Sequence, residues 1–179
     1  MKKYGLDLLL ATSPIHVYYT TGLPVLHSAA NPILASLANQ YPYLGLIRKA
    51  GENTVFHWNV FKSAETMCWA ADSVGIESPR DVQKALKQWG MEGKRVGVES
   101  TAPKYVMDVL NDPKLAIEVV EADQAFRDMR LVKSEKEMEY ILKATEITET
   151  ALRACIDACA VGVTDNELLA IGKKAMPEA

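Results

Sequence analysis

The sequence predicts an α/β domain that continues into a long helix. Short apolar runs, which are typical of buried strands, alternate with segments of helical periodicity between residues 7 and 120. Strands that alternate with short helices in this way are typical of α/β architecture. From residue 134 onward, the pattern changes to one extended helical period that opens with a capping motif. We therefore expect two parts, residues 1–133 and residues 134–179.

The first predicted strand is the apolar run 7–12, which reads DLLLAT. It breaks at Ser13 and Pro14, where we expect a turn. The second clear signal is a helix start, because Ser78 is a good N-cap and Pro79 fits the first helical position. That helix is expected to stop at Gly90. The other predicted elements are strands at 43–48, 54–58, 95–99 and 116–120 and helices at 63–71 and 103–110.

Two capping boxes mark the C-terminal part. The Ser134 hydroxyl can accept the N–H of Glu137, while the Glu137 carboxylate reaches back to the Ser134 N–H. Thr164 and Glu167 repeat this pairing and open another helix. Gly162 is expected to end the first of the two helices in a left-handed conformation.

The long helix after Ser134 carries a stripe of apolar and small side chains. Its members lie at helical spacing: Met138, Ile141, Leu142, Thr145, Thr148, Leu152, Ile156 and Cys159. We interpret this as a buried stripe that needs cover. It is expected to pack on its own domain, to pair with a second chain, or to fray beyond residue 160. The preceding residues 127–133 are expected to be the basic end of a strand.

Both ends of the chain resemble creatinase/prolidase-type proteins, which include Xaa-Pro aminopeptidases, Xaa-Pro dipeptidases and creatine amidinohydrolases. The N-terminal motif is carried by Asp7, Leu9, Leu10, Ser13, Pro14, Val17, Tyr19, Thr21, Gly22 and Leu23. The C-terminal motif is carried by Arg130, Lys133, Ser134, Glu137, Gly162, Val163, Thr164, Glu167 and Leu168. The chain departs from the family pattern at His16, where Asn is usual, at Thr20, where Leu is usual, and at Val60, where Arg is usual.

The resemblance implies a three-layer N-terminal domain, with a mixed β-sheet flanked by helices and a long C-terminal linker helix. It implies a non-catalytic domain for dimerisation or substrate access in a metal-dependent hydrolase similar to Xaa-Pro dipeptidases and aminopeptidases. The expected assembly is a homodimer, and the substrate of the larger protein would be a small peptide or amide. Two alternatives stay open: a stand-alone, non-enzymatic binding or dimerisation module, and the N-terminal part of a creatinase-like amidinohydrolase.

Catalytic residues and metal ligands are not expected within the chain. In the family that it resembles, two divalent ions (Mn, Co or Zn) are held by two Asp, one His and two Glu of a following "pita-bread" domain. The three histidines here, His16, His27 and His57, all precede residue 58, so this ligand set is expected to lie beyond residue 179. The chain should therefore be inactive alone.

A few residues remain as site candidates. His27 and Asn31 lie in the segment 22–39, which the resemblance suggests as a loop that reaches the partner subunit's substrate; a plain surface connection is the favoured alternative. A triad of Asp7, Ser13 and His16 is disfavoured, because strand and turn separate its members. Cys155 and Cys159 stand one helical turn apart, but small buried side chains are a better interpretation than a metal pair.

Composition narrows the class further. A net charge of −3 and a pI near 5.7 argue against nucleic acid as a main partner. No apolar run approaches the about 20 residues of a membrane span, and we expect no membrane association. Three unevenly spaced cysteines favour a reducing, cytoplasmic environment over a disulfide framework.

Overall fold

The computed structural model describes residues 1–23, 44–48, 51–58 and 68–176. Within the described residues the chain divides into two compact units, Met1–Met129 and Arg130–Ala179. This division falls a few residues before the expected one between 133 and 134. No helix among the described residues has both the length and the apolar character that a membrane crossing requires.

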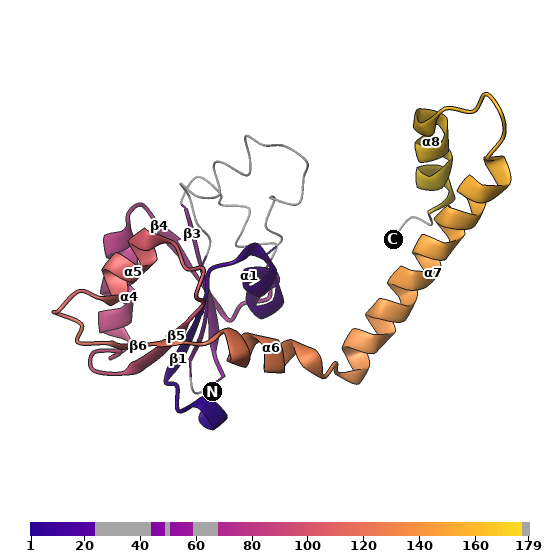
Figure 1. The fold of residues 1–179 in the computed structure, drawn as a ribbon. Coiled ribbons are helices and arrows are strands. Elements are labelled where there is room, and N and C mark those ends of the chain that lie inside the picture. Colours follow the sequence, from indigo (N-terminus) through magenta and orange to yellow (C-terminus); the bar gives the residue numbers. More distant parts are fainter. Residues whose placement is uncertain (24–43, 49–50, 59–67, 177–179) are drawn as a thin grey trace. The chain divides into compact units, whose positions relative to one another are not determined.

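The first unit is built on a six-stranded mixed sheet (Figure 1) with the strand order β4-β3-β2-β1-β5-β6. Its strands are β1 (Leu8–Ala11), β2 (Leu44–Arg48), β3 (Asn53–Trp58), β4 (Asp72–Ile76), β5 (Arg95–Val98) and β6 (Glu118–Glu121). β1 lies in the middle, antiparallel to β2 and parallel to β5. The pairs β3–β4 and β5–β6 are parallel as well, and β2–β3 is antiparallel. The expected α/β fold with a mixed sheet is confirmed.

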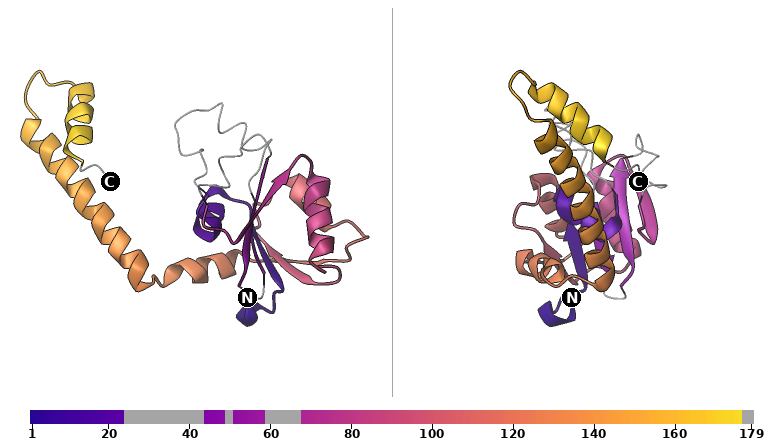
Figure 2. Two further views of the ribbon diagram at one scale, coloured as in Figure 1. Left: turned by 180° about the vertical axis from the view of Figure 1, so that it is seen from behind. Right: turned by 90° about the vertical axis from the view of Figure 1, so that its right-hand side faces the viewer.

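Helices cover both faces of this sheet. They are η1 (Lys2–Tyr4), α1 (Pro14–Thr21), α4 (Pro79–Gln88), α5 (Lys104–Leu110) and α6 (Asp123–Leu131). Helices α4 and α5 lie on one face, and α1 and α6 lie on the other (Figure 1, Figure 2). Because successive side chains of a strand point to opposite faces, Leu8 and Leu10 enter the α4–α5 core and Leu9 enters the α1–α6 core. This explains why β1 is apolar throughout.

Helix α4 begins where Ser78 and Pro79 predict a helix start. Pro79 occupies the first turn, and the Ser78 N–H donates to the Asp81 carboxylate over 3.0 Å. The hydrogen bond from the Lys84 ammonium, together with the one from the Glu77 N–H, lowers the pKa of Asp81 to about 2. The helix then buries Val82, Ala85 and Leu86 and ends at Gln88, before Gly90, which has a φ of 65°.

Three expectations were wrong in whole or in part, and one strand was not expected. Ser13 and Pro14 do not form a simple turn, because Ser13 caps α1 and Pro14 is its first residue. Residues 127–133 are not a strand end, because α6 continues to Leu131 after burying Ala125 and Phe126 in the α1–α6 core. Strand β4 was not expected. Of the helix expected at 63–71, residues 63–67 lie outside the described residues and 68–71 are not helical.

The second unit is a helical hairpin of α7 (Glu135–Ala158) and α8 (Asp165–Ala175) (Figure 1). Both capping boxes are confirmed. The Ser134 N–H donates to Glu137 over 2.8 Å, and the Thr164 N–H donates to Glu167 over 2.8 Å. Gly162 has a φ of 95°, but α7 already ends at Ala158. The glycine therefore shapes the turn into α8 and does not cap α7.

The apolar stripe of α7 is not covered within this hairpin. Helix α8 packs on a different face of α7, where Gly172 approaches Cys155 so closely that an added Cβ would lie 2.8 Å from its sulfur. The Cys155 thiol donates to the Leu168 carbonyl over 3.3 Å. Large side chains of the stripe stay exposed, among them Met138, Ile141, Leu142, Leu152 and Ile156. Cover of the stripe by the chain's own domain or by a second chain therefore stays a prediction.

Replacing Ser134 with alanine is expected to destabilise the start of α7 by about 0.5–2 kcal/mol. The variant removes the hydroxyl that accepts the Glu137 N–H, so this amide should exchange with deuterium faster than in the parent. Ser134→Asp is the matched control because it restores an acceptor at the cap. Equal exchange at Glu137 in the parent and the alanine variant would contradict the capping argument.

Candidate functional site

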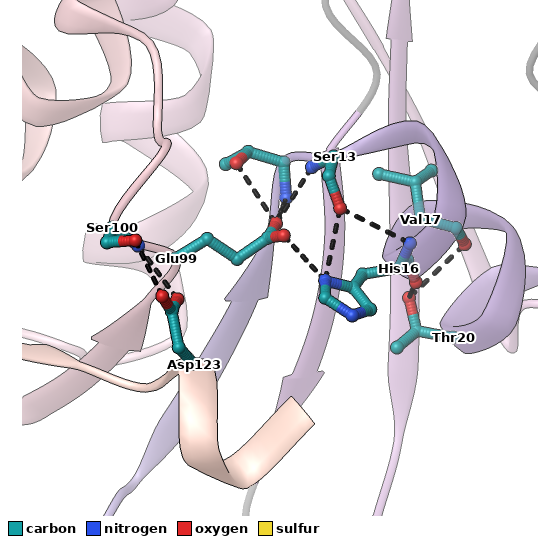
Figure 3. Close-up of polar contacts among 8 residues, drawn as sticks. Ser13, His16, Val17, Thr20, Glu99, Ser100 and Asp123 are labelled. Atoms are coloured by element: carbon teal, nitrogen blue, oxygen red, sulfur yellow. Dashed lines mark hydrogen bonds and ion pairs between the residues drawn. The ribbon is translucent and has the colours of Figure 1, made fainter. Parts of the chain in front are cut away.

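A polar cluster lies where β1 and β5 end (Figure 3). The two strands are parallel neighbours, so the residues that follow them meet at one edge of the sheet. Ser13 and His16 come from the start of α1, Glu99 and Ser100 follow β5, and Asp123 begins α6. In α/β folds, the carboxyl edge of the sheet is where ligand sites are usually found. The contacts within this cluster show what it does.

Glu99 is the centre of the cluster, and only 4% of the residue is exposed. One carboxylate oxygen accepts the Ser13 N–H over 2.8 Å and the Thr12 hydroxyl over 3.0 Å, and it also accepts the Thr12 N–H. These N–H groups immediately precede α1. The Glu99 carboxylate thus lies at the N-terminus of that helix, where the helix dipole favours a negative charge.

His16 connects Glu99 to α6. Its Nδ1 lies 2.5 Å from the second carboxylate oxygen of Glu99 and 3.1 Å from the Ser13 hydroxyl. Its ring stacks on Phe126, with the ring centroids 4.4 Å apart and the planes 14° from parallel. The contacts therefore join the start of α1, the end of β5 and the first turn of α6.

This geometry does not resemble a nucleophilic triad. In a triad, the histidine contacts the nucleophile through one ring nitrogen and the carboxylate through the other. Here the Ser13 hydroxyl and the Glu99 carboxylate share Nδ1 of His16. Asp7, the third member of the disfavoured triad, accepts the Arg95 N–H over 3.2 Å at the opposite end of β1. The arrangement orients α1 and gives no support to Ser13 as an activated nucleophile.

Asp123 is held by a second pair of bonds. Its two oxygens accept the Ser100 N–H over 2.9 Å and the Ser100 hydroxyl over 2.6 Å. The hydroxyl and then the N–H of Ser100 lower the pKa of Asp123 below its usual value. The bonds fix the start of α6 to the segment after β5.

Acid is expected to destabilise this cluster. Burial alone raises the pKa of Glu99, but hydrogen bonds from Ser13, Thr12 and His16 outweigh it and hold that pKa below 4.5. A carboxyl whose folded pKa is depressed stabilises the fold fully above its unfolded pKa and loses that contribution as the pH falls through the folded pKa. The urea concentration at the unfolding midpoint should therefore decrease as the pH is lowered below about 4.5. The decrease in the urea midpoint per pH unit should be smaller in the Glu99→Gln variant. An equal decrease in the parent and the variant would show that Glu99 does not cause the acid sensitivity.

The other site candidates predicted from the sequence lie in separate parts of the chain. The substrate-loop candidates His27 and Asn31 lie outside the described residues, so the loop stays a prediction. His57 is buried on β3. Cys155 is half-buried and Cys159 is exposed, and both are free thiols, so the expected burial is wrong for Cys159. Among the described residues, no group of three or more His, Cys, Asp or Glu side chains is placed to share a metal ion.

Sequence reasoning missed Glu99 and Asp123. The available signal was modest: each acidic residue follows a strand of the parallel part of the sheet, Glu99 directly after β5 and Asp123 soon after β6. Parallel neighbours end at the same edge, so the two acids were candidates to meet the turn after β1. Thr12, one of the hydrogen-bond partners of Glu99, lies 87 positions away in the sequence. No local sequence pattern reveals a contact at that separation.

Solved structures identify the class of fold. The chain superposes on the prolidase from Pyrococcus horikoshii with a TM-score of 0.67, 24% identity and coverage of 98% of this chain and 45% of that one. It superposes on the X-Pro aminopeptidase from Thermotoga maritima with a TM-score of 0.74, 16% identity and coverage of 98% and 46%. A solved proline dipeptidase chain from Streptococcus pneumoniae gives a TM-score of 0.56 at 19% identity, over 74% of this chain and 92% of that one. The fold is that of a prolidase N-terminal domain.

The family follows from the sequence match. The chain belongs to the Creatinase/Prolidase N-terminal domain family, whose model matches residues 1–132. A similar curated protein is the Xaa-Pro dipeptidase from Pyrococcus horikoshii, which is 28% identical over 171 residues, or 95% of this chain and 43% of the dipeptidase. The chain therefore spans less than half of that relative and corresponds to its N-terminal part. The family resemblance seen at both ends of the sequence is confirmed.

Proposed function

We propose that this chain acts as the non-catalytic N-terminal domain of a metal-dependent peptidase that cleaves Xaa-Pro bonds. The observation that carries the proposal is the match to a Xaa-Pro dipeptidase along 95% of this chain but only 43% of the relative. In this proposal, the domain contributes to a cytoplasmic homodimer and to substrate access. Two divalent ions, Mn, Co or Zn, bind in a following domain that supplies their ligands.

The polar cluster supports a role in positioning. Helix α1 ends at Thr21 and leads into the segment that holds His27 and Asn31. Glu99 fixes the start of that helix from β5, and the His16–Phe126 stack ties it to α6. The cluster thus fixes the start of α1 against β5 and α6. We propose that it orients the base of the substrate loop.

The coding sequence tests the proposed parent protein. If the reading frame continues past codon 179 into a segment with two Asp, one His and two Glu at metal-binding spacing, the peptidase proposal is supported. A stop codon at that position would overturn it. The result would favour the alternative, a stand-alone binding or dimerisation module. That alternative has one observation behind it: the Streptococcus pneumoniae chain is matched over 92% of its length, so a solved chain consists almost entirely of this fold.

An activity assay tests the proposal that this chain does not cleave Xaa-Pro peptides by itself. Residues 1–179 incubated with Mn²⁺ or Co²⁺ and the dipeptide Met-Pro are expected to release no proline above a metal-only blank, because the proposed ligands belong to the following domain. The Xaa-Pro dipeptidase from Pyrococcus horikoshii serves as the positive control. Turnover by residues 1–179 that survives repurification and is removed by a chelator would show that the chain carries a site of its own.

A further inference from the structure

We draw no further inference here: the strongest candidate, the exposed apolar face of α7 formed by Met138, Ile141, Leu142, Leu152 and Ile156, carries no proposal because nothing in the described part of the chain shows what covers it.

Discussion

Replacing Glu99 with alanine is expected to lower the free energy of unfolding of the first unit by about 2–5 kcal/mol. The substitution leaves the N–H groups of Thr12 and Ser13 without their acceptor, and it removes the carboxylate from Nδ1 of His16. Unpaired donors are costly here because the Glu99 carboxylate that they contact is only 4% exposed. A domain of this size is stable by only about 5–15 kcal/mol, so the loss would be a large part of the total.

Two matched variants isolate the cause. Glu118→Ala removes a carboxylate whose side chain is 61% exposed and which pairs with Arg95, and it should cost no more than about 1 kcal/mol. Glu99→Gln keeps an acceptor for the backbone N–H groups but removes the charge, and its effect should lie between the other two. Urea denaturation followed by tryptophan fluorescence measures all three. A Glu99→Ala midpoint equal to that of Glu118→Ala would show that the cluster does not stabilise the fold.

Replacing Gly22 with alanine is expected to destabilise the first unit by about 2–5 kcal/mol. Gly22 ends α1 with a φ of 75°, a left-handed conformation that L-residues adopt at a cost. A Cβ built there would lie 2.1 Å from a ring carbon of Trp69. The backbone N–H of Trp69 donates to the Thr21 carbonyl over 2.8 Å. This bond anchors the backbone of Trp69 beside α1. The methyl group is therefore expected to displace the indole ring as well as strain the backbone.

Gly90→Ala is the control for this substitution. Gly90 has a φ of 65°, but no atom lies within 4 Å of a Cβ placed there, so only the backbone cost of about 1–2 kcal/mol should appear. The double variant Gly22→Ala, Trp69→Ala should recover the difference, because the indole is gone. Trp69→Ala alone measures what the indole contributes to the parent, and that loss is subtracted in the comparison. Equal losses for Gly22→Ala and Gly90→Ala would rule out the steric contribution of Trp69.

Local patterns predicted most of the regular structure, and their failures have physical causes. Ser78 with Pro79 and Ser134 with Glu137 marked helix starts because capping depends on residues close in sequence. The Ser13–Pro14 pair carries the same signal as Ser78–Pro79. The helix that follows it, however, is short and rich in Thr and Tyr, which favour helices only weakly.

Strand β4 was missed for a different reason. It lies at the edge of the sheet and includes Asp72 and Gly75, so it lacks the apolar run that marks β1. An edge strand gains its structure from its pairing with β3 more than from its own composition. Helix α6 shows the same limit. The basic residues after Phe126 were predicted as strand, whereas burial of Phe126 in the α1–α6 core favours the helix.

The central position of β1 also has a consequence for biosynthesis. Its partner β5 pairs Leu9 with Gly97, so nearly ninety further residues must be translated before that edge is satisfied. Until then, a wholly apolar strand remains open on one side, which is a template for misassociation. Such long-range pairing also slows folding. The nascent chain is therefore most exposed to misassociation between the emergence of β1 from the ribosome and the arrival of β5.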